Sequence, residues 1–517
     1  MSARRSGYLF EVFLVSFAAL LLEISYTRVF SFKVSSYYTY LIIGFALLGL
    51  GSGGVFVALR PRLREAPLDG LLPRLGVAGA LAVGLGYALV AAVEIDSFAP
   101  PTDPGPLSAL VLVCLALFAS FLAVGLFLAA VFARSPGAIH RLYFADLLGA
   151  GTGCAAAVPC MLWLTPPGCV LGAGAALALA GLRPALRGAR PLAAAGALVA
   201  AVLAGLALFA DRLPDPVVAP AKSLGRSGGN DLAFRRLFHR WHPVFRVDVL
   251  DSWKLPDRLI LAHDGHIGSM LPRFDGDAAE WARAYERSNR ALPFAVAPER
   301  PRVLVIGSAG GNEIRASLHF GASSVTAVEL NPVTVSLLRE RFADYTGRLA
   351  EHERVRLVNA EGRTFLMRDE ARYDLIWFVA PDSYAAMNAA TASSFVLVES
   401  YLYTREMIAE ALGHLTPGGV LCMQFGEVNY DSKPNRTARY LATARAAFTD
   451  LGIEGFARHV LLATNAEYPW QLSTLILSKS PSARSRCGAS PGRPPPPRTR
   501  WSDTPGGKEG TGRWRAG

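Results

Sequence analysis

Long apolar runs in the first 210 residues place the strongest constraint on how this chain can fold. A helix needs about 20 mostly apolar residues to cross the hydrocarbon core of a bilayer. About seven stretches approach that length: 8–30, 38–59, 71–93, 107–133, 142–164, 167–183 and 191–210. The sixth is short and follows Pro166-Pro167, so 142–183 also reads as a tight helical hairpin. Residues 1–210 are therefore predicted to form a multi-pass α-helical membrane domain.

Composition narrows the function classes. The hydrophobic fraction of 52% is high for a soluble protein. The net charge of +11 could suggest nucleic acid, but much of it lies in loops between apolar runs and in the last forty residues, and no nucleic-acid recognition motif accompanies it. The six cysteines include no Cys-x-x-Cys pair, so neither a disulfide framework nor a zinc or redox site is predicted, and no metal is expected.

The arginines of the membrane domain make two predictions that conflict. Cytoplasmic loops of membrane proteins are enriched in Lys and Arg. These residues place the N-terminus inside. Three loops carry them: Arg60, Arg62, Arg64 and Arg74 in the first, Arg134 and Arg141 in the second, and Arg183, Arg187 and Arg190 in the third. Seven full crossings would place residues after 211 outside, whereas cytosol normally supplies an adenosine cofactor. The sequence-based expectation is a cytosolic soluble domain in a bacterial plasma membrane, with 167–183 or 191–210 not crossing fully.

Three further segments follow the membrane domain. Residues 211–300 contain short alternating runs, such as Val244–Leu250 and 258–262, and the Asp264-Gly265 turn, which predict a small β-rich subdomain. Residues 301–477 alternate strands and helices, the pattern of a parallel sheet with crossovers. Residues 478–517 are rich in Pro, Gly and Arg and are predicted to be disordered. Because the composition changes abruptly, we also hypothesise that this tail is an artefact replacing the natural continuation.

Polar residues at three successive strand ends predict a nucleoside site. An apolar strand runs into Gly307-Ser308-Ala309-Gly310-Gly311, a glycine loop that opens a helix. Glu329 ends the next strand, where a carboxylate can accept both ribose hydroxyl hydrogens, and Asn331 follows it. Glu361 follows the third strand, where it could face the adenine amino group. The predicted cofactor residues are Gly307, Gly310, Gly311, Glu329, Asn331 and Glu361.

On these motifs the chain resembles the spermidine/spermine synthase superfamily, in its bacterial form fused to a membrane domain. The resemblance covers most of 8–477. It rests on Ala18–Phe30, Arg141–Ala150, Pro243–Val247, Asp264-Gly265, Tyr285, Arg302–Asn312, Glu329, Glu361 and Leu415–Gly419. It implies an α/β Rossmann-like domain of the S-adenosylmethionine methyltransferase type, preceded by the β-rich subdomain. It also implies that Asp382 and Tyr285 are catalytic and face the acceptor.

Three positions depart from the family pattern. Gly310 stands where the family has the loop aspartate that helps hold the amino-acid end of the cofactor, and Val379 stands where it has the first catalytic aspartate. Phe245-Arg246 replaces a Tyr-Gln pair. Losing a carboxylate and gaining Arg246 should make the acceptor site less anionic and poorly suited to a diammonium substrate. Gln424 and the segment from Asp382 to Thr391 are further pocket candidates, whereas Asp374 is expected to support the strand edge.

The sequence thus predicts a membrane-anchored transferase. It would move an aminopropyl or other alkyl group from S-adenosylmethionine or its decarboxylated form to an amine. Two alternatives remain open: an S-adenosylmethionine-dependent methyltransferase, and a non-catalytic transporter or sensor with a nucleoside-binding domain. The expected partners are the lipid bilayer and a small-molecule amine or other acceptor, with a homo-oligomer as an open alternative and no nucleic acid.

Overall fold

The computed structural model divides the chain into two compact units. It describes residues 7–34, 38–96, 99, 102–220, 222–225, 234–274, 285–286, 288–379, 401–427, 430, 432–465, 472–481 and 500–502. The first unit comprises Met1–Asp231, His239–Asp248 and His263–Ile267. The second comprises Leu232–Phe238, Val249–Ala262 and Gly268–Gly517. Each unit is described by itself below.

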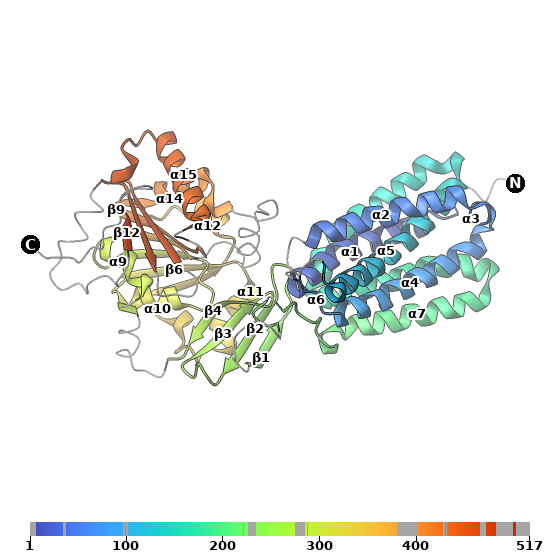
Figure 1. Ribbon diagram of the computed structural model, residues 1–517, viewed down its shortest axis with the longest axis horizontal. Helices are drawn as coiled ribbons and strands as arrows, with labels where there is room; N and C mark the ends of the chain where they lie inside the picture. The colour runs from blue at the N-terminus through green and yellow to red at the C-terminus, as the bar shows by residue number, and fades with distance from the viewer. Residues whose placement is uncertain are drawn as a thin grey trace, which may run out of the picture. The chain divides into compact units, whose positions relative to one another are not determined.

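The first unit is a bundle of long apolar helices (Figure 1). Its helices are α1 (Leu9–Lys33), α2 (Tyr38–Leu59), α3 (Pro61–Glu65), α4 (Leu68–Ala92), α5 (Pro104–Ala133), α6 (Ile139–Gly188) and α7 (Arg190–Leu208). Within the described residues, six of them are long and apolar enough to cross a membrane. α6 lies against α1, α4 and α7, and α2 lies against α5.

α6 is two antiparallel arms joined at a sharp bend, which confirms the predicted helical hairpin. Thr165 has φ 62° and interrupts the helical backbone immediately before Pro166. On the first arm, Gly153 lies against Phe17 of α1. On the second arm, Arg183 binds Glu11, which is nearer the start of α1. The second arm therefore runs back beside α1, and 142–164 and 167–183 are separate segments as predicted.

Glycines allow the helices of the bundle to approach each other closely. A Cβ atom on Gly53 of α2 would overlap the backbone of Gly125 on α5. A Cβ atom on Gly149 of α6 would overlap the carbonyl of Phe13 on α1. Small residues are commonly found at such close crossings because helices in lipid associate by packing rather than by hydrophobic burial.

The β-rich segment forms a four-stranded sheet in the order β1-β2-β3-β4. Its strands are β1 (Phe234–Arg240), β2 (Val247–Ser252), β3 (Arg258–His263) and β4 (His266–Pro272). Asp264 and Gly265 have φ values of 46° and 80° and form the two-residue turn between β3 and β4, as predicted. The strand expected from Val244 begins only at Val247.

The second unit contains an eight-stranded sheet in the order β12-β10-β11-β9-β8-β5-β6-β7. The strands are β5 (Arg302–Ile306), β6 (Ser324–Glu329), β7 (Val355–Asn359), β8 (Tyr373–Val379), β9 (Leu415–Gly426), β10 (Val460–Asn465), β11 (Leu472–Ser478) and β12 (Arg500–Ser502). β5 to β9 pair in parallel, while β11 is antiparallel to β9 and β10. The sequence order reverses between β5 and β8, where open sheets of this kind bind ligands at the carboxyl ends of the strands.

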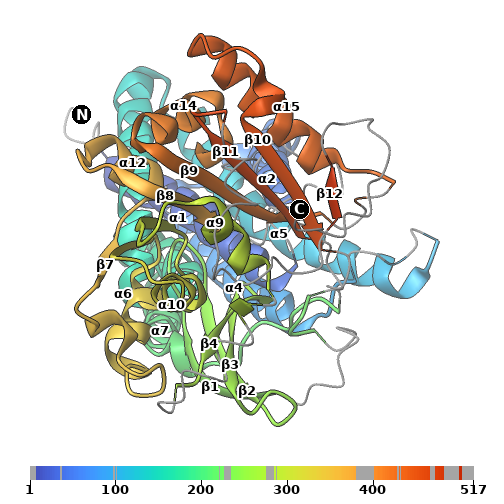
Figure 2. The same cartoon turned by 90° about the vertical axis from the view of Figure 1, so that its left-hand side faces the viewer.

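Helices cover the faces of this sheet. α14 (Arg405–Gly413) and α15 (Asn435–Asp450) lie together on one side (Figure 2). Their buried apolar residues pack with those of β5, β8 and β9 in one core. The unit also contains α9 (Leu292–Val296), α10 (Asn312–His319), α11 (Pro332–Ser336), continued by a π-helical turn over Leu337–Arg341, and α12 (Gly362–Arg368).

Several outcomes differ from the sequence-based expectations. β10 and α12 were not predicted. The segment 478–517 was predicted to be disordered, but Arg500–Ser502 form β12 and pair with β10. The rest of that tail beyond Pro481 lies outside the described residues.

Candidate functional site

The backbone of the glycine loop after β5 adopts conformations that disfavour residues with a side chain. Gly307 and Gly311 have φ values of 87° and 85°, in the left-handed region that favours glycine. A Cβ atom on Gly307 would also lie 2.8 Å from the carbonyl oxygen of Val379 at the end of β8. Ala309, with φ 40°, adopts the same region despite its side chain. The loop therefore brings bare backbone to the carboxyl edge of the sheet.

Gly310 is held against β4. Its N–H donates to the Ser269 hydroxyl at 3.3 Å, and Asn312 Nδ2 donates to the Met270 carbonyl at 2.9 Å. A Cβ atom on Gly310 would overlap that Met270 carbonyl oxygen. Any side chain at this position, including the aspartate that the family resemblance implies, would thus meet the β4 backbone. The packing of the loop against β4 therefore requires the glycine at position 310, where the family pattern has an aspartate.

Glu329 joins β6 to the glycine loop. Its carboxylate accepts hydrogen bonds from the backbone N–H groups of Ala309 and Asn331, each at 2.9 Å, and its residue is 6% exposed. Burial raises the pKa of Glu329 above its ordinary value, and these N–H groups offset only part of the rise. The structure therefore places a buried carboxylate beside the loop, where the sequence predicted a ribose acid.

Asn331 and Glu361 both cap helices. The Asn331 side chain accepts from the Val333 N–H at 3.0 Å and begins α11. Glu361 accepts from the N–H groups of Arg363 and Thr364 at 2.8 and 2.7 Å and begins α12. Burial acts to raise the pKa of Glu361, but these hydrogen bonds outweigh it and the pKa is lowered. These capping bonds give both residues a structural role. Cofactor binding by Asn331 and a contact between Glu361 and adenine remain predictions.

Tyr285 is buried beside α10. Its ring lies 5.9 Å from that of His319, centroid to centroid, and the residue is 3% exposed. Burial raises the pKa of its hydroxyl, so the phenol stays protonated at neutral pH. Arg258, Arg290 and Arg315 are close enough to act on that pKa. Sequence reasoning missed this arginine-rich surrounding, because the three residues come from separate elements.

The other predicted pocket residues divide into two groups. Asp382 and the segment to Thr391 lie outside the described residues. Gln424 is 5% exposed and is used structurally, because it accepts from Trp377 Nε1 and donates to Asn289 and Thr474. Asp374 accepts from the Arg302 N–H and the Thr416 hydroxyl, which confirms its expected role at the strand edge.

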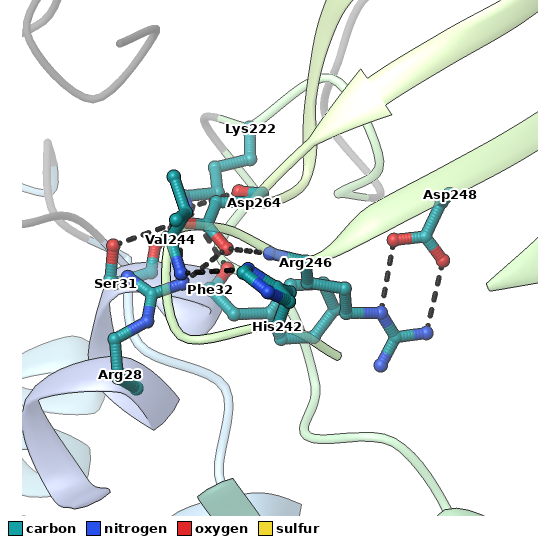
Figure 3. Close-up of polar contacts among 9 residues, drawn as sticks. All are labelled: Arg28, Ser31, Phe32, Lys222, His242, Val244, Arg246, Asp248 and Asp264. Atoms are coloured by element: carbon teal, nitrogen blue, oxygen red, sulfur yellow. Dashed lines mark hydrogen bonds and ion pairs between the residues drawn. The ribbon is translucent and has the colours of Figure 1, made fainter. Parts of the chain in front are cut away.

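Arg246 does not add free positive charge to an acceptor site, and this corrects the expectation from the sequence. It is fully buried in the first unit and forms ion pairs with Asp215 and Asp248. Its guanidinium lies 4.4 Å from the centroid of the Phe32 ring (Figure 3). It lies 5.0 Å from the centroid of the Trp241 ring. Two carboxylates pair with the cation and two aromatic rings contact it, so its function in this unit is structural.

The β3–β4 turn is bonded to the last turns of α1. Asp264 accepts from Arg28 at 3.0 Å, from Ser31 at 3.1 Å and from the Arg246 N–H at 2.9 Å (Figure 3). Lys222 Nζ donates to the carbonyls of Ser31, Phe32 and Asp264, so it caps the end of α1. Burial lowers the pKa of Lys222 to about 7. We call five of these residues the turn cluster: Arg28, Ser31, Lys222, Arg246 and Asp264.

We expect Asp264→Asn to destabilise the full-length protein by about 3 kcal/mol, because removing one member of a buried ion pair leaves the other charge uncompensated. Arg28 and Lys222 lower the pKa of Asp264 against the effect of burial. The stabilisation is thus present above pH 3.8, the ordinary pKa of an aspartic acid, and is lost as the pH falls through the lower folded-state pKa of Asp264.

Thermal unfolding of Asp264→Asn in detergent at pH 7 measures the effect. Asp344→Asn, which removes an exposed pair with Arg348, is the control and should change stability by less than about 1 kcal/mol. Equal effects would contradict this role.

The fold and the site together define a class. A mixed sheet whose parallel strands reverse their order beside a glycine loop, with a buried acid at the end of the second strand, is a Rossmann-like domain of the S-adenosylmethionine methyltransferase type. The described residues contain no group of three or more His, Cys, Asp or Glu arranged to hold a metal ion.

Comparison with known proteins shows which family part of this unit resembles. Residues 283–448 match the family model described as the spermine/spermidine synthase domain. The matched residues include Tyr285, the glycine loop, Glu329 and Glu361.

Two curated relatives and one solved structure illustrate the likeness. Polyamine aminopropyltransferase 2 of Pseudomonas aeruginosa is 29% identical over 215 residues, covering 41% of this chain and 54% of the relative. The polyamine aminopropyltransferase of Lachnospira eligens is 29% identical over 141 residues, covering 27% and 45%. Spermidine synthase from Thermotoga maritima is 16% identical with a TM-score of 0.34, covering 49% of this chain and 75% of that one. The chain thus spans about half the length of the curated relatives it matches.

Proposed function

We propose that this chain is a membrane-anchored transferase. It would move an aminopropyl or other alkyl group from a decarboxylated S-adenosylmethionine-type donor to an amine. The observation that carries the proposal is the buried Glu329 carboxylate, bonded to the glycine loop inside the spermine/spermidine synthase domain. The long apolar helices would anchor it in a bacterial plasma membrane.

The reaction needs little covalent help from the protein. The acceptor nitrogen would attack the methylene carbon beside the sulfonium, forming a C–N bond. The C–S bond would break, and its electrons would leave with sulfur as a neutral thioether. The proton lost from nitrogen would pass to a carboxylate, for which Asp382 is the candidate, with the neutral Tyr285 hydroxyl as a hydrogen-bond partner. Holding donor and acceptor in line would supply most of the rate.

The acceptor would carry at most one positive charge. Arg258, Arg290 and Arg315 act on Tyr285, and two of them are paired, Arg258 with Asp257 and Arg290 with Glu313 at 2.7 Å. Val379 supplies no carboxylate at the end of β8. An acceptor site with one carboxylate fewer would hold a diammonium compound less well than a monoamine or a neutral acceptor, which supports an acceptor other than a simple diamine.

The first test is replacement of Glu329 by alanine in the full-length protein. We expect binding of methylthioadenosine or decarboxylated S-adenosylmethionine to fall at least 100-fold, because two or more ribose hydrogen bonds to a charged group are lost. Calorimetric titration measures the loss. Glu353→Ala, at an exposed acid in the same unit, is the control. Undiminished affinity in Glu329→Ala would contradict the assignment of the site.

The raised pKa of Glu329 adds a pH dependence to this test. If the ionised carboxylate binds the ribose, affinity should weaken as the pH falls through that pKa, at a higher pH than the ordinary value of 4.5 for a glutamic acid. Binding that is constant down to that ordinary value would show that the ionised form is not required.

A methyltransferase is the second candidate, and the packing of Gly310 against β4 favours it. Without the loop aspartate, nothing at this position distinguishes a donor that keeps its carboxylate from one that has lost it. The same titrations separate the two proposals, since tighter binding of S-adenosylmethionine than of its decarboxylated form favours methyl transfer. Binding of methylthioadenosine without turnover of either donor would favour a non-catalytic nucleoside sensor.

A further inference from the structure

The connections between the helices of the bundle gather at two opposite ends. At one end, Arg134 Nε donates to the Arg64 carbonyl at 2.6 Å, which joins the α5–α6 connection to the α2–α4 connection. At the same end, Arg183 binds Glu11 at the start of α1, and Arg187 lies 3.9 Å from Asp69 at the start of α4. We call this the arginine end.

The opposite end is where the chain leaves the bundle. Lys33, at the end of α1, donates to the carbonyls of Val93 and Val217. The bend of α6 is there too, because Gly168 lies against Ala207 at the end of α7. We call this the exit end. The turn cluster belongs to it, since its helical members come from the last turns of α1.

Basic side chains at the two ends behave differently. At the arginine end, exposed guanidinium groups project from every connection: Arg60, Arg62 and Arg64; Arg141; Arg183, Arg187 and Arg190. At the exit end, Lys33, Lys222 and Arg246 are buried and bonded inside the unit, and Arg212 and Arg240 are the exposed basic residues among those described there. The connection between α4 and α5 there carries Glu94, Asp96 and Asp103 and no basic residue.

The last helices of the bundle are long enough to complete their crossings. α7 has 19 residues, which at 1.5 Å per residue is about 28 Å, close to the thickness of the hydrocarbon core. The bend at Thr165 leaves α6 with one arm before it and one arm after it, each longer than α7. Seven segments are therefore long enough to cross, whereas the sequence-based expectation of a cytosolic domain required one of 167–183 and 191–210 not to cross fully. An odd number of crossings places the N-terminus and the residues after Leu208 on opposite sides.

We propose that the arginine end is the cytoplasmic face of the bundle, seated among anionic lipid headgroups. Residues after Leu208 then lie on the other side of the membrane. Loops rich in Arg remain cytoplasmic and attract the anionic lipids of that leaflet. Among the described residues after Leu208, no helix is long and apolar enough to cross back. This last step rests on the proposed function: a nucleoside ligand of the Glu329 site reaches it from outside the cytosol. This topology does not depend on which reaction the site performs.

Two single cysteines test the proposal in a cysteine-free version of the full chain. Gly137→Cys lies at the arginine end, where a Cβ atom meets nothing within 4 Å, and Thr102→Cys lies in the exposed connection at the exit end. A membrane-impermeant maleimide added to intact bacterial spheroplasts should label Thr102→Cys fully. It should label Gly137→Cys only after the membrane is opened, with a difference of at least tenfold.

Reporters fused after Gly517 of the otherwise unaltered chain give an independent reading. Alkaline phosphatase, active only after export, should be active there, and a green fluorescent protein, which matures in the cytosol, should be dark. A fluorescent fusion, or labelling of Gly137→Cys in intact spheroplasts, would overturn the proposal. Neither measurement uses a ligand, so loss of nucleoside binding would count against the proposed function and not against the topology.

Discussion

Gly310→Asp is expected to destabilise the second unit by about 3 kcal/mol or more and to abolish nucleoside binding. The first atom of the new side chain would overlap the Met270 carbonyl oxygen. Because the obstacle is backbone, no change of the Met270 side chain can make room. Relief requires β4 to move away from the loop and to break the hydrogen bonds at Ser269 and Asn312. Restoring the family residue should therefore damage this protein.

Thermal unfolding and calorimetric binding of methylthioadenosine measure both effects. Gly413→Ala, on α14, is the matched control, because its Cβ atom would meet nothing within 4 Å. It should leave unfolding and binding within error of the parent. A stable Gly310→Asp protein that binds the decarboxylated donor more tightly would show that β4 yields readily, and that the amino-group subsite is latent rather than lost.

Gly53→Val should prevent the bundle from folding. Its Cβ atom would overlap the backbone of Gly125, where α2 and α5 cross. Neither helix can yield by changing a rotamer, so the two must separate and lose their packing, at a cost of several kcal/mol by comparison with overpacked cores. We expect loss of the monodisperse peak in size-exclusion chromatography in detergent.

The neighbouring glycine gives a close control for this change. A Cβ atom on Gly54 would meet nothing within 4 Å, so Gly54→Val adds the same side chain to the same helix on its exposed face. Gly54→Val should yield folded protein in amounts similar to the parent. Equal loss in both variants would indicate that helix propensity or insertion, rather than the α2–α5 crossing, limits folding.

The Rossmann-like domain could be predicted from local patterns because its signals are short in range. The apolar run before Gly307 predicted β5. Glu329 could be placed at the strand end by its spacing from the glycine loop. β10 was missed because its sequence, Val-Leu-Leu-Ala-Thr-Asn, gives no clear alternation of apolar and polar residues.

The environment of each site residue could not be read from the sequence. Arg246 is neutralised by Asp215, thirty-one positions away, and it stacks on Phe32 at the far end of α1. Gly310 meets Met270, forty positions earlier, across a different sheet. Such contacts depend on tertiary packing, which the sequence does not show. Arg246 was therefore expected in an acceptor site. Asp382 remains a prediction.

The turn cluster has a consequence for how the protein can be divided. A fragment beginning after Leu208 would look like a complete soluble enzyme in the sequence, yet it would carry Asp264 and Lys222 without α1. Arg28 and the carbonyls of Ser31 and Phe32 would be missing, so the Asp264 carboxylate and the Lys222 ammonium would both lose their partners on α1. The β3–β4 turn and α1 should therefore melt in one cooperative step. The part of this chain that can fold by itself therefore does not begin where the apolar sequence ends.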